Sequence, residues 1–371
     1  MVDPLCKYFG KCAGCTSQHI DYQLQLQNKQ QWLAKAIKYD DIKVISDKDY
    51  FYRNRMDFIF YPGGIGLRTQ SGSKNVINIE ECVISDKKIN ILLKEVRCFF
   101  SENDLYGIFL KSNTFRYLVI RSTKNISSIS FVLSENSHRL AEAINYLKSF
   151  AVNSSADNIL VTYTSAYDAE STSSDSFIIK GSDQLHDTFL GKNFWFSAQG
   201  FFQNNSSMAE KMLQYSHQIL QKYETKNAQL LDLYGGVGTF GIINADIFKN
   251  IMVIENNSLS IEAANKNIIE NKVKNVTAKV LDAKQLRKVS LSQPLYVITD
   301  PPRSGMDIKV IQYLNQLKPK VIIYISCNIQ QLAKELPKFK DYEIQSAALF
   351  DLFPQTPHSE AVVELKLKPT N

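Results

Sequence analysis

The chain has 371 residues, which is long enough for two or more domains that each bury a core. Its content of 44% hydrophobic and 22% charged residues is ordinary for a soluble globular protein. The formal net charge of +6 permits a polyanionic partner without requiring one, and no apolar run is long enough to span a membrane, so we expect a cytoplasmic protein without a signal peptide.

Three closely spaced cysteines, Cys6, Cys12 and Cys15, open the chain, with glycines between them that permit tight turns. In a cytoplasmic protein, cysteines indicate metal binding or catalysis before disulfides. Thiols at this spacing bind either zinc or an iron–sulfur cluster, and both normally take four ligands. The fourth ligand is Cys82, between an expected strand and an expected helix, or Cys98, whose apolar surroundings favour a core position. The spacing leaves zinc and iron–sulfur open.

Residues 25–37 are expected to form an amphipathic helix. Residues 50–61 alternate aromatic and basic side chains, as a strand with one polar face does, and this face carries Arg53 and Arg55. Basic and aromatic side chains on a sheet suit contacts to RNA, although a solvated sheet face gives the same pattern.

The composition changes near residue 194, and from there strands and helices alternate as in a doubly wound sheet. This pattern divides the chain into an N-terminal region with the cysteines and the basic strand over residues 1–90, a central α+β region continuous with it over residues 91–193, and an α/β domain over residues 194–371. The aromatic segment at residues 194–202 is either a wall of a ligand pocket or part of the core.

A glycine-rich loop at residues 235–241 follows an expected buried strand and precedes an expected helix. Its glycines let the backbone approach a ligand at the helix N-terminus. The next strand ends at Glu255, which is placed to bind ribose hydroxyls, and a further strand ends at Asp282, which suits an adenine edge. A nicotinamide enzyme and an S-adenosylmethionine enzyme would both show the loop and Glu255. Asp232 favours the second, because its charge opposes a pyrophosphate and suits a sulfonium and an amino group.

Three further motifs follow in this domain. Asp300-Pro-Pro-Arg303 ends one strand, Ser326-Cys327-Asn328 ends the next, and Glu360 stands at the last. Ligands bind at the carboxyl ends of strands in open α/β sheets, so an acid, a cysteine and an acid in these places predict a covalent active site. Cys327 is the expected nucleophile and Glu360 the expected base. A buried, inert cysteine is the alternative for Cys327 alone.

Together these motifs resemble the RNA uracil-C5 methyltransferases, the family that makes 5-methyluridine in rRNA and tRNA. The resemblance covers nearly the whole chain and includes the N-terminal cysteines with Cys82, the motif Phe202-Gln-Asn-Asn205, the glycine-rich loop, the Asp-Pro-Pro-Arg and Ser-Cys-Asn motifs, and His358-Ser-Glu360. It implies an α/β fold, with a C-terminal class I, Rossmann-like S-adenosylmethionine methyltransferase sheet and an N-terminal iron–sulfur and α+β RNA-contacting domain.

The same resemblance implies roles for individual residues. It favours a [4Fe–4S] cluster over zinc, with Cys6, Cys12, Cys15 and Cys82 as ligands. It places Gln203, Tyr234, Thr239, Glu255 and Asp300 at the S-adenosylmethionine site, to which the residue patterns add Gly236 and Asp282.

The chemistry that these residues permit begins with the thiolate of Cys327 adding to C6 of uracil, which makes C5 nucleophilic. After C5 has received the methyl group, Glu360 removes the C5 proton and Cys327 leaves. The uracil must leave its stack to reach the thiol, so we expect base flipping in single-stranded or loop RNA. His358 orients Glu360 or contacts RNA, and Arg303 shapes the site or holds a phosphate.

Many members of the family begin with a small β-barrel domain called TRAM, whereas this chain starts directly at the cysteines, as the shorter rRNA-modifying members do. We therefore expect 23S rRNA as the substrate, with a tRNA T-loop uridine as the alternative, and no membrane or obligate protein partner. A nicotinamide oxidoreductase with an iron–sulfur domain is a second class, but it leaves Cys327 and Glu360 idle. A non-catalytic RNA-binding factor on a degenerate methyltransferase fold is a third.

Overall fold

The computed structural model describes residues 2–109, 112–165, 170–173 and 175–369. Contacts divide the chain into two compact units, and each unit is built from separate stretches of sequence. The first unit contains the N-terminal residues to Asp21, Lys48–Asp187 and Phe196–Ser206, and the second contains Tyr22–Asp47, Thr188–Trp195 and the residues from Ser207 onward. The units are therefore interleaved along the chain and differ from the three consecutive ranges expected from composition.

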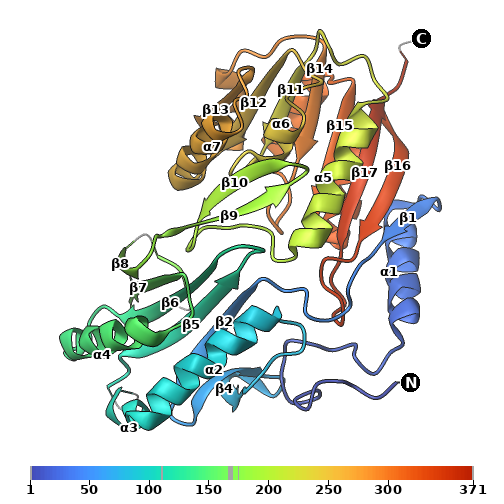
Figure 1. The fold of residues 1–371 in the computed structure, drawn as a ribbon. Helices are drawn as coiled ribbons and strands as arrows, with labels where there is room; N and C mark the ends of the chain where they lie inside the picture. The colour runs from blue at the N-terminus through green and yellow to red at the C-terminus, as the bar shows by residue number, and fades with distance from the viewer. Residues whose placement is uncertain (1, 110–111, 166–169, 174, 370–371) are drawn as a thin grey trace. The chain divides into compact units, whose positions relative to one another are not determined.

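The first unit contains a seven-stranded sheet in the order β4-β3-β2-β5-β6-β7-β8 (Figure 1). All neighbouring strands are antiparallel except β6 and β7. The strands are β2 (Arg55–Tyr61), β3 (Gly64–Thr69), β4 (Gly72–Asn78), β5 (Phe115–Ser122), β6 (Ser127–Ser134), β7 (Asn158–Thr164) and β8 (Ser176–Lys180). The helices are α2 (Lys87–Glu102), α3 (Leu105–Phe109) and α4 (Leu140–Asn153).

One face of this sheet carries the core of the first unit. Alternate residues of β2, such as Phe58 and Phe60, pack in one apolar cluster with Leu92 and Phe100 of α2 and Leu147 of α4. Because successive strand residues point to opposite faces, the intervening residues of β2 and β5 belong to the face away from these helices. That second face carries the arginines of the basic strand.

The second unit contains an eight-stranded sheet in the order β1-β16-β17-β15-β14-β11-β12-β13. The strands β11 to β15 are mutually parallel, β17 runs antiparallel to β15 and β16, and β1 is parallel to β16. The strands are β1 (Ile42–Ile45), β11 (Gln229–Leu233), β12 (Asn250–Glu255), β13 (Val276–Val280), β14 (Leu295–Thr299), β15 (Val321–Ser326), β16 (Tyr342–Phe350) and β17 (Glu360–Leu367).

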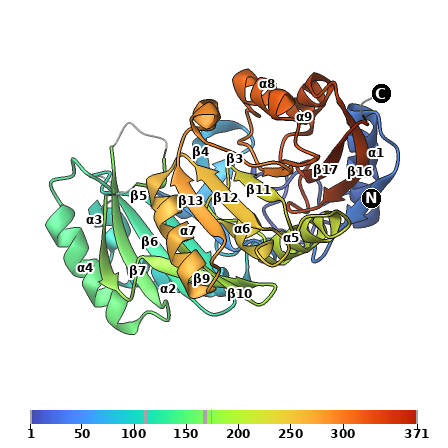
Figure 2. The same cartoon turned by 90° about the horizontal axis from the view of Figure 1, so that it is seen from above.

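Helices cover both faces of this sheet, as expected for a doubly wound fold. Figure 2 shows α8 and α9 on one side of the sheet and α5, α6 and α7 on the other. The apolar cluster that α8 and α9 share with the sheet also contains Leu33 and Ile37 of α1. The helices are α1 (Tyr22–Ile37), α5 (Ser206–Leu220), α6 (Thr239–Ile243), α7 (Ser258–Glu270), α8 (Ile308–Leu317) and α9 (Ile329–Glu335), with 3₁₀ turns η1 (Ala283–Lys288) and η2 (Leu336–Lys338).

A two-stranded sheet of β9 (Gln184–Phe189) and β10 (Lys192–Ser197) contains two of the points at which the chain passes from one unit to the other. The expected helix at residues 25–37 is confirmed as α1, while the expected strand at residues 50–61 begins only at Arg55. No helix in the described ranges is long and apolar enough to cross a membrane.

Candidate functional site

The predicted cofactor and catalytic residues of the second unit gather at one edge of its sheet. Because β11 to β15 are parallel, their carboxyl ends lie at the same edge. Each of the five ends carries one predicted residue, in strand order Tyr234, Glu255, Asp282, Asp300 and Cys327. Glu360 opens the antiparallel strand β17, and the pairing of Ser326 with Ala361 brings that start to the same edge.

The glycine-rich loop after β11 has two kinds of glycine. A Cβ at Gly235 would lie 2.6 Å from Cγ1 of Val253, so this glycine is required by packing. Gly236 has a φ of +53°, and a Cβ there would meet no described atom within 4 Å. Open space above a left-handed backbone position lets a ligand approach the main chain closely. Thr239, within this glycine-rich segment, begins α6.

Three carboxyl groups surround the loop. Asp232 is buried and accepts a hydrogen bond from the backbone N–H of Gly241 (2.8 Å). Glu255 accepts backbone hydrogen bonds from residues 256 and 257 (2.8 and 2.9 Å) and a longer one from Gly236 (3.3 Å). Burial, and then the charges of Asp300 and Glu255, raise the pKa of Asp232 to about 7. Burial also raises the pKa of Asp300 to about 7. The carboxyl-rich surroundings suit a cationic ligand and oppose a pyrophosphate.

Tyr234 and Asp282 follow the ends of β11 and β13. The carboxylate of Asp282 caps the turn η1 by accepting the N–H of Lys284 (2.9 Å), so one of its oxygens is already in use. Burial, followed by the charge of Asp282, raises the pKa of the Tyr234 hydroxyl, which therefore stays protonated at neutral pH. Both residues lie at the strand ends where the sequence predicted them.

Cys327 stands in a loop that is tied to the Asp-Pro-Pro-Arg motif. The side chain of Asn328 donates to the carbonyl of Arg303 (3.0 Å) and caps α9 by accepting the N–H of Gln331 (3.2 Å). Burial, followed by the charges of Glu360 and Asp300, raises the pKa of Cys327 to about 11, whereas Arg303 lowers it by its charge and a hydrogen bond. The thiol, two carboxyl groups and a guanidinium thus lie close enough to affect one another.

Glu360 is a buried acid with unused hydrogen-bonding capacity. Its exposed fraction is 5%, and its Oε2 atom has no hydrogen-bond partner among the described residues. Burial and the charge of Asp300 raise its pKa well above the ordinary value, while Arg303 opposes this shift. Glu364, the neighbouring candidate, accepts from Tyr223 and Ser346 (both 2.5 Å). Glu360 is therefore the acid that remains available to a ligand.

A loop over residues 351–359 leads into Glu360, and the sequence did not predict that α1 holds this loop in place. Lys29 of α1 forms a buried ion pair with Asp351 (2.6 Å), and Tyr22 donates to the same carboxylate (2.8 Å). Gln25 donates to the side chain of Gln355 (2.9 Å). These three α1 residues are spaced by three and four positions, so they share one face of the helix. The same face buries apolar residues. Long polar side chains among buried apolar ones were the sequence feature that could have predicted this contact.

His358 lies in the same loop but is exposed. Its ring is edge-on to Phe353, with ring centroids 6.5 Å apart. Burial, followed by the charges of Arg303 and Lys29, lowers its pKa, so the imidazole is neutral at pH 7. Its two predicted roles, orienting Glu360 or contacting RNA, stay predictions.

The four predicted cluster cysteines of the first unit line one shared cavity of about 40 Å³. Burial raises the pKa of Cys6, Cys12 and Cys15, the last to about 12, and Cys82 raises each of them further. Cys98 is exposed on α2 and does not line the cavity, so the expectation that it belongs to the core is wrong. Of the two candidates for the fourth thiol, Cys82 is the one that lines this cavity.

This cavity is not arranged around one ion. Within the described ranges, no group of three or more His, Cys, Asp or Glu side chains is arranged to hold a metal ion. The predicted iron–sulfur domain is therefore not shown, although its four thiols are brought together.

The aromatic segment is mostly core. Phe194, Phe196 and Phe202 are buried, and the last two stack with ring centroids 3.9 Å apart. Phe201 is the exception, with 71% of its surface exposed. Gln203 belongs to the first unit, where its backbone carbonyl accepts from Asn54 (2.9 Å). It is thus the one predicted cofactor residue outside the second unit.

Comparisons with known proteins point to one family. The model of the tRNA (uracil-5-)-methyltransferase family matches residues 21–368. The tRNA (uracil(54)-C(5))-methyltransferase of Pyrococcus abyssi is 32% identical over 98% of this chain and 86% of that protein. An RNA methyltransferase of Clostridium tetani without an assigned target is 31% identical over 100% of this chain and 85% of its own length. The crystal structure of the Pyrococcus abyssi tRNA (uracil-54, C5)-methyltransferase in complex with S-adenosyl-L-homocysteine matches with a TM-score of 0.79 at 27% identity, covering 95% of this chain and 86% of that one.

Proposed function

Because the chain belongs to the tRNA (uracil-5-)-methyltransferase family, we propose that it methylates C5 of a uridine in tRNA, with S-adenosylmethionine as the methyl donor. It is an RNA uracil-C5 methyltransferase of the class I α/β fold, and this membership rules against the nicotinamide oxidoreductase alternative. The observation that carries the proposal is the gathering of Cys327, Glu360, Asp300 and Arg303 at one edge of the second sheet.

The choice of tRNA rests on relatives. Several of them are named tRNA (uracil(54)-C(5))-methyltransferases, so tRNA is the favoured substrate and its T-loop uridine the favoured target. The preference for 23S rRNA expected from the sequence receives no support from these relatives and stays a prediction. A cytoplasmic location and independence from a protein partner also stay predictions.

Cys327 is proposed as the nucleophile. Its thiolate adds to C6 of uracil and forms a carbon–sulfur bond, which makes C5 an enolate carbon that can accept a methyl group. Its raised pKa means that the resting thiol is protonated, so a proton must leave before the addition. Arg303 favours that loss, because its charge stabilises the thiolate.

Glu360 is proposed as the base of the second half of the reaction. After C5 carries both a proton and a methyl group, the carboxylate takes that proton, the C5–C6 double bond re-forms and the sulfur of Cys327 leaves as thiolate. The raised pKa of Glu360 makes its carboxylate a stronger base than an exposed one. The unused Oε2 atom is the one available to receive the proton.

S-Adenosylmethionine supplies the methyl group, and the loop after β11 fits it chemically. The open backbone position at Gly236 permits a close approach, and the carboxyl groups of Asp232, Glu255 and Asp300 suit a cation. Tyr234, Thr239 and Asp282 are proposed to complete the site in the second unit, and the cofactor role of Gln203 stays a prediction.

We also propose that Cys6, Cys12, Cys15 and Cys82 hold a [4Fe–4S] cluster. The donor set fits, because each thiolate of such a cluster binds a different iron. The four cysteines line one shared cavity, which supports the proposal. The raised thiol pKa values mean that loading the cluster releases protons. Methylation needs no electrons, so the cluster is proposed to be structural or RNA-facing.

The reaction is tested with methyl-labelled S-adenosylmethionine and anaerobically purified protein, given an unmodified tRNA transcript or a 23S rRNA transcript. We expect labelled 5-methyluridine from tRNA and none with Cys327→Ala. Cys98→Ala is the matched control, since Cys98 is exposed and lies outside the cysteine cavity. Label from 23S rRNA alone would restore the sequence-based preference, and absence of label in both would refute the proposal.

A variant of Glu360 and a matched control test which acid removes the C5 proton. Glu360→Gln should accumulate a methylated RNA–protein adduct that survives denaturing electrophoresis, whereas Glu364→Gln should not.

Iron and sulfide analysis tests the cluster, which Cys82→Ser should lose and Cys98→Ser should keep. Stoichiometric zinc in place of iron would contradict the cluster assignment.

A further inference from the structure

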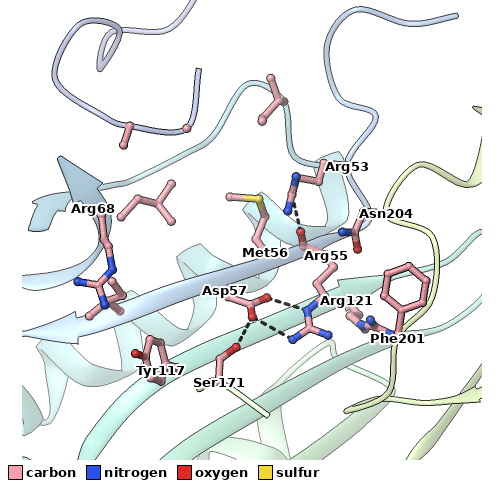
Figure 3. Close-up of a pocket in the computed structure, with 15 residues that line it drawn as sticks. Arg53, Arg55, Met56, Asp57, Arg68, Tyr117, Arg121, Ser171, Phe201 and Asn204 are labelled. Carbon is pink, nitrogen blue, oxygen red and sulfur yellow. Dashed lines mark hydrogen bonds and ion pairs between the residues drawn. The ribbon is translucent and has the colours of Figure 1, made fainter. Parts of the chain in front are cut away.

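The first unit contains a second, larger pocket, of about 640 Å³, on the sheet face away from α2 and α4. We call it the arginine pocket, because its lining includes Arg53, Arg55, Arg68 and Arg121 but only one acid, Asp57. Figure 3 shows these side chains, with Tyr117 and Phe201 at its sides. Its volume lies within the range of ligand pockets, and its lining includes neither Cys327 nor Glu360.

The pocket arises from the register of β2 and β5. Arg55 is paired with Arg121, and Ile59 with Tyr117, so both strands present these side chains to the same face. In antiparallel sheets directly opposed like charges destabilise each other. Asp57, two residues along β2, offsets part of this repulsion, because Arg55 donates two hydrogen bonds to its carboxylate (2.8 and 2.9 Å).

One carboxylate does not balance the two paired arginines. The hydroxyl of Ser171 also donates to Asp57, so both carboxylate oxygens are occupied. Burial would raise the pKa of Asp57, but the hydrogen bonds from Arg55 and the charges of Arg55 and Arg121 hold it below its ordinary value. The carboxylate is therefore fully ionised, and the floor of the pocket still carries excess positive charge.

Arg121 carries that excess. It is 4% exposed, its guanidinium lies over the ring of Phe196, and its Nε–H has no hydrogen-bond partner within the described part of the chain. Its guanidinium donates a long hydrogen bond to the carbonyl of Ser197 (3.5 Å). Buried guanidinium groups are normally paired with an anion. The Oδ1 atom of Asn204, in the same lining, is likewise buried without a partner among the described residues.

The side-chain groups of the pocket that lack a hydrogen-bond partner among the described residues indicate the chemistry of the ligand. A guanidinium with free donors matches the oxygen atoms of a phosphate. Aromatic side chains beside it offer faces on which a base stacks, and Phe201 is 71% exposed. We propose that the arginine pocket binds a nucleotide of the RNA substrate, through its phosphate and its base, other than the uridine that is methylated. This inference rests on the proposed function only for the identity of the ligand as RNA.

Binding is measured by fluorescence anisotropy of a labelled, unmodified tRNA transcript with the full chain, over a series of salt concentrations. Arg121→Met should weaken binding roughly tenfold or more and reduce the salt slope of log Kobs by about one, as expected for one lost phosphate contact. Phe201→Ala should weaken binding several-fold without changing the slope, because stacking is not ionic. In turnover assays both variants should raise KM and leave kcat unchanged.

Arg139→Gln is the matched control. It removes one positive charge from the same unit at a position where Arg139 pairs with Glu142 outside the pocket, so it should change the Kd less than twofold. Arg121→Met is expected to fold, since an apolar replacement of a buried charge is often neutral or stabilising. If it unfolds, Phe201→Ala and Arg68→Gln test the pocket at exposed positions.

The inference is overturned if Arg121→Met and Phe201→Ala bind RNA with the Kd and salt slope of Arg139→Gln. It is also overturned if inorganic phosphate binds in an Arg121-dependent way while RNA binding does not depend on Arg121, because the pocket is then a simple anion site. Failure of the proposed function looks different. A wild-type protein that binds RNA through the pocket but forms no 5-methyluridine contradicts the reaction and leaves the pocket in place.

Discussion

Replacing Lys29 by Met removes one half of the buried ion pair that fastens α1 to the loop before Glu360. The side chains of Lys29 and Asp351 are 6% and 0% exposed, and their charged atoms are 2.6 Å apart. Lys29 also donates to the carbonyl of Phe353 (3.2 Å). The substitution therefore leaves a buried carboxylate without its cation and a loop with one attachment fewer.

The magnitude follows from the buried carboxylate that loses its cation. An uncompensated buried charge costs about 3–5 kcal/mol. The retained hydrogen bond from Tyr22 reduces it somewhat. We expect Lys29→Met to lower the free energy of unfolding by about 3–4 kcal/mol at pH 7.

Lys29→Met/Asp351→Asn is the matched control. It carries no buried charge at this place, so it should be more stable than Lys29→Met at pH 7.

Urea unfolding followed by tryptophan fluorescence measures the loss of stability in the second unit, which contains the ion pair. The chain has two tryptophans, Trp32 and Trp195, and both belong to the second unit. The reasoning is refuted if Lys29→Met loses less than about 1 kcal/mol at pH 7, or if Lys29→Met/Asp351→Asn is no more stable than Lys29→Met.

Alkylation of Cys327 by iodoacetamide, followed by peptide mass spectrometry, should accelerate about tenfold per pH unit between pH 7 and pH 10, because its pKa of about 11 keeps the thiolate scarce. Arg303→Met should slow it throughout that range, and an unchanged rate would remove Arg303 from the electrostatics of the thiol. Gly305→Ala should lower the free energy of unfolding by about 1–3 kcal/mol in urea titrations, because φ there is +81° and a Cβ would lie 2.0 Å from Oε1 of Glu335. Asn328→Ala should lower the free energy of unfolding by about 1 kcal/mol, because α9 loses its cap. It should also lower kcat while changing KM less, because the hydrogen bond from Asn328 to the carbonyl of Arg303 is lost. A free energy of unfolding equal to that of the wild type would argue against the cap.

The arrangement of the second unit was largely predictable from the sequence, because its strands are short apolar runs with functional residues at their ends. In a parallel sheet such ends must meet at one edge, so placing Asp300 and Cys327 needed no knowledge of distant contacts. Glu360 required one more step, since it opens an antiparallel strand. The alternation of Arg53 and Arg55 indicated a polar sheet face but not a pocket.

What the sequence did not reveal depends on contacts between distant segments. The pattern of α1 shows that one face is apolar, but not that this face packs in the second unit. Cys98 was expected in the core because its neighbours are apolar, yet on a helix those neighbours occupy other faces and the thiol is exposed. Arg121 lies in an apolar strand, and only the register with β2 sets it opposite Arg55.

The interleaving of the two units constrains how the protein can be made. The edge strand β1 leaves the ribosome long before β16, the strand with which it pairs. Until β16 is made, α1 and β1 offer an unpaired edge and an uncovered apolar face, which is the condition under which chaperones and misassembly compete with folding. Loss of β16 and β17, by a stop codon before them or by proteolysis, would therefore also remove the partner of β1.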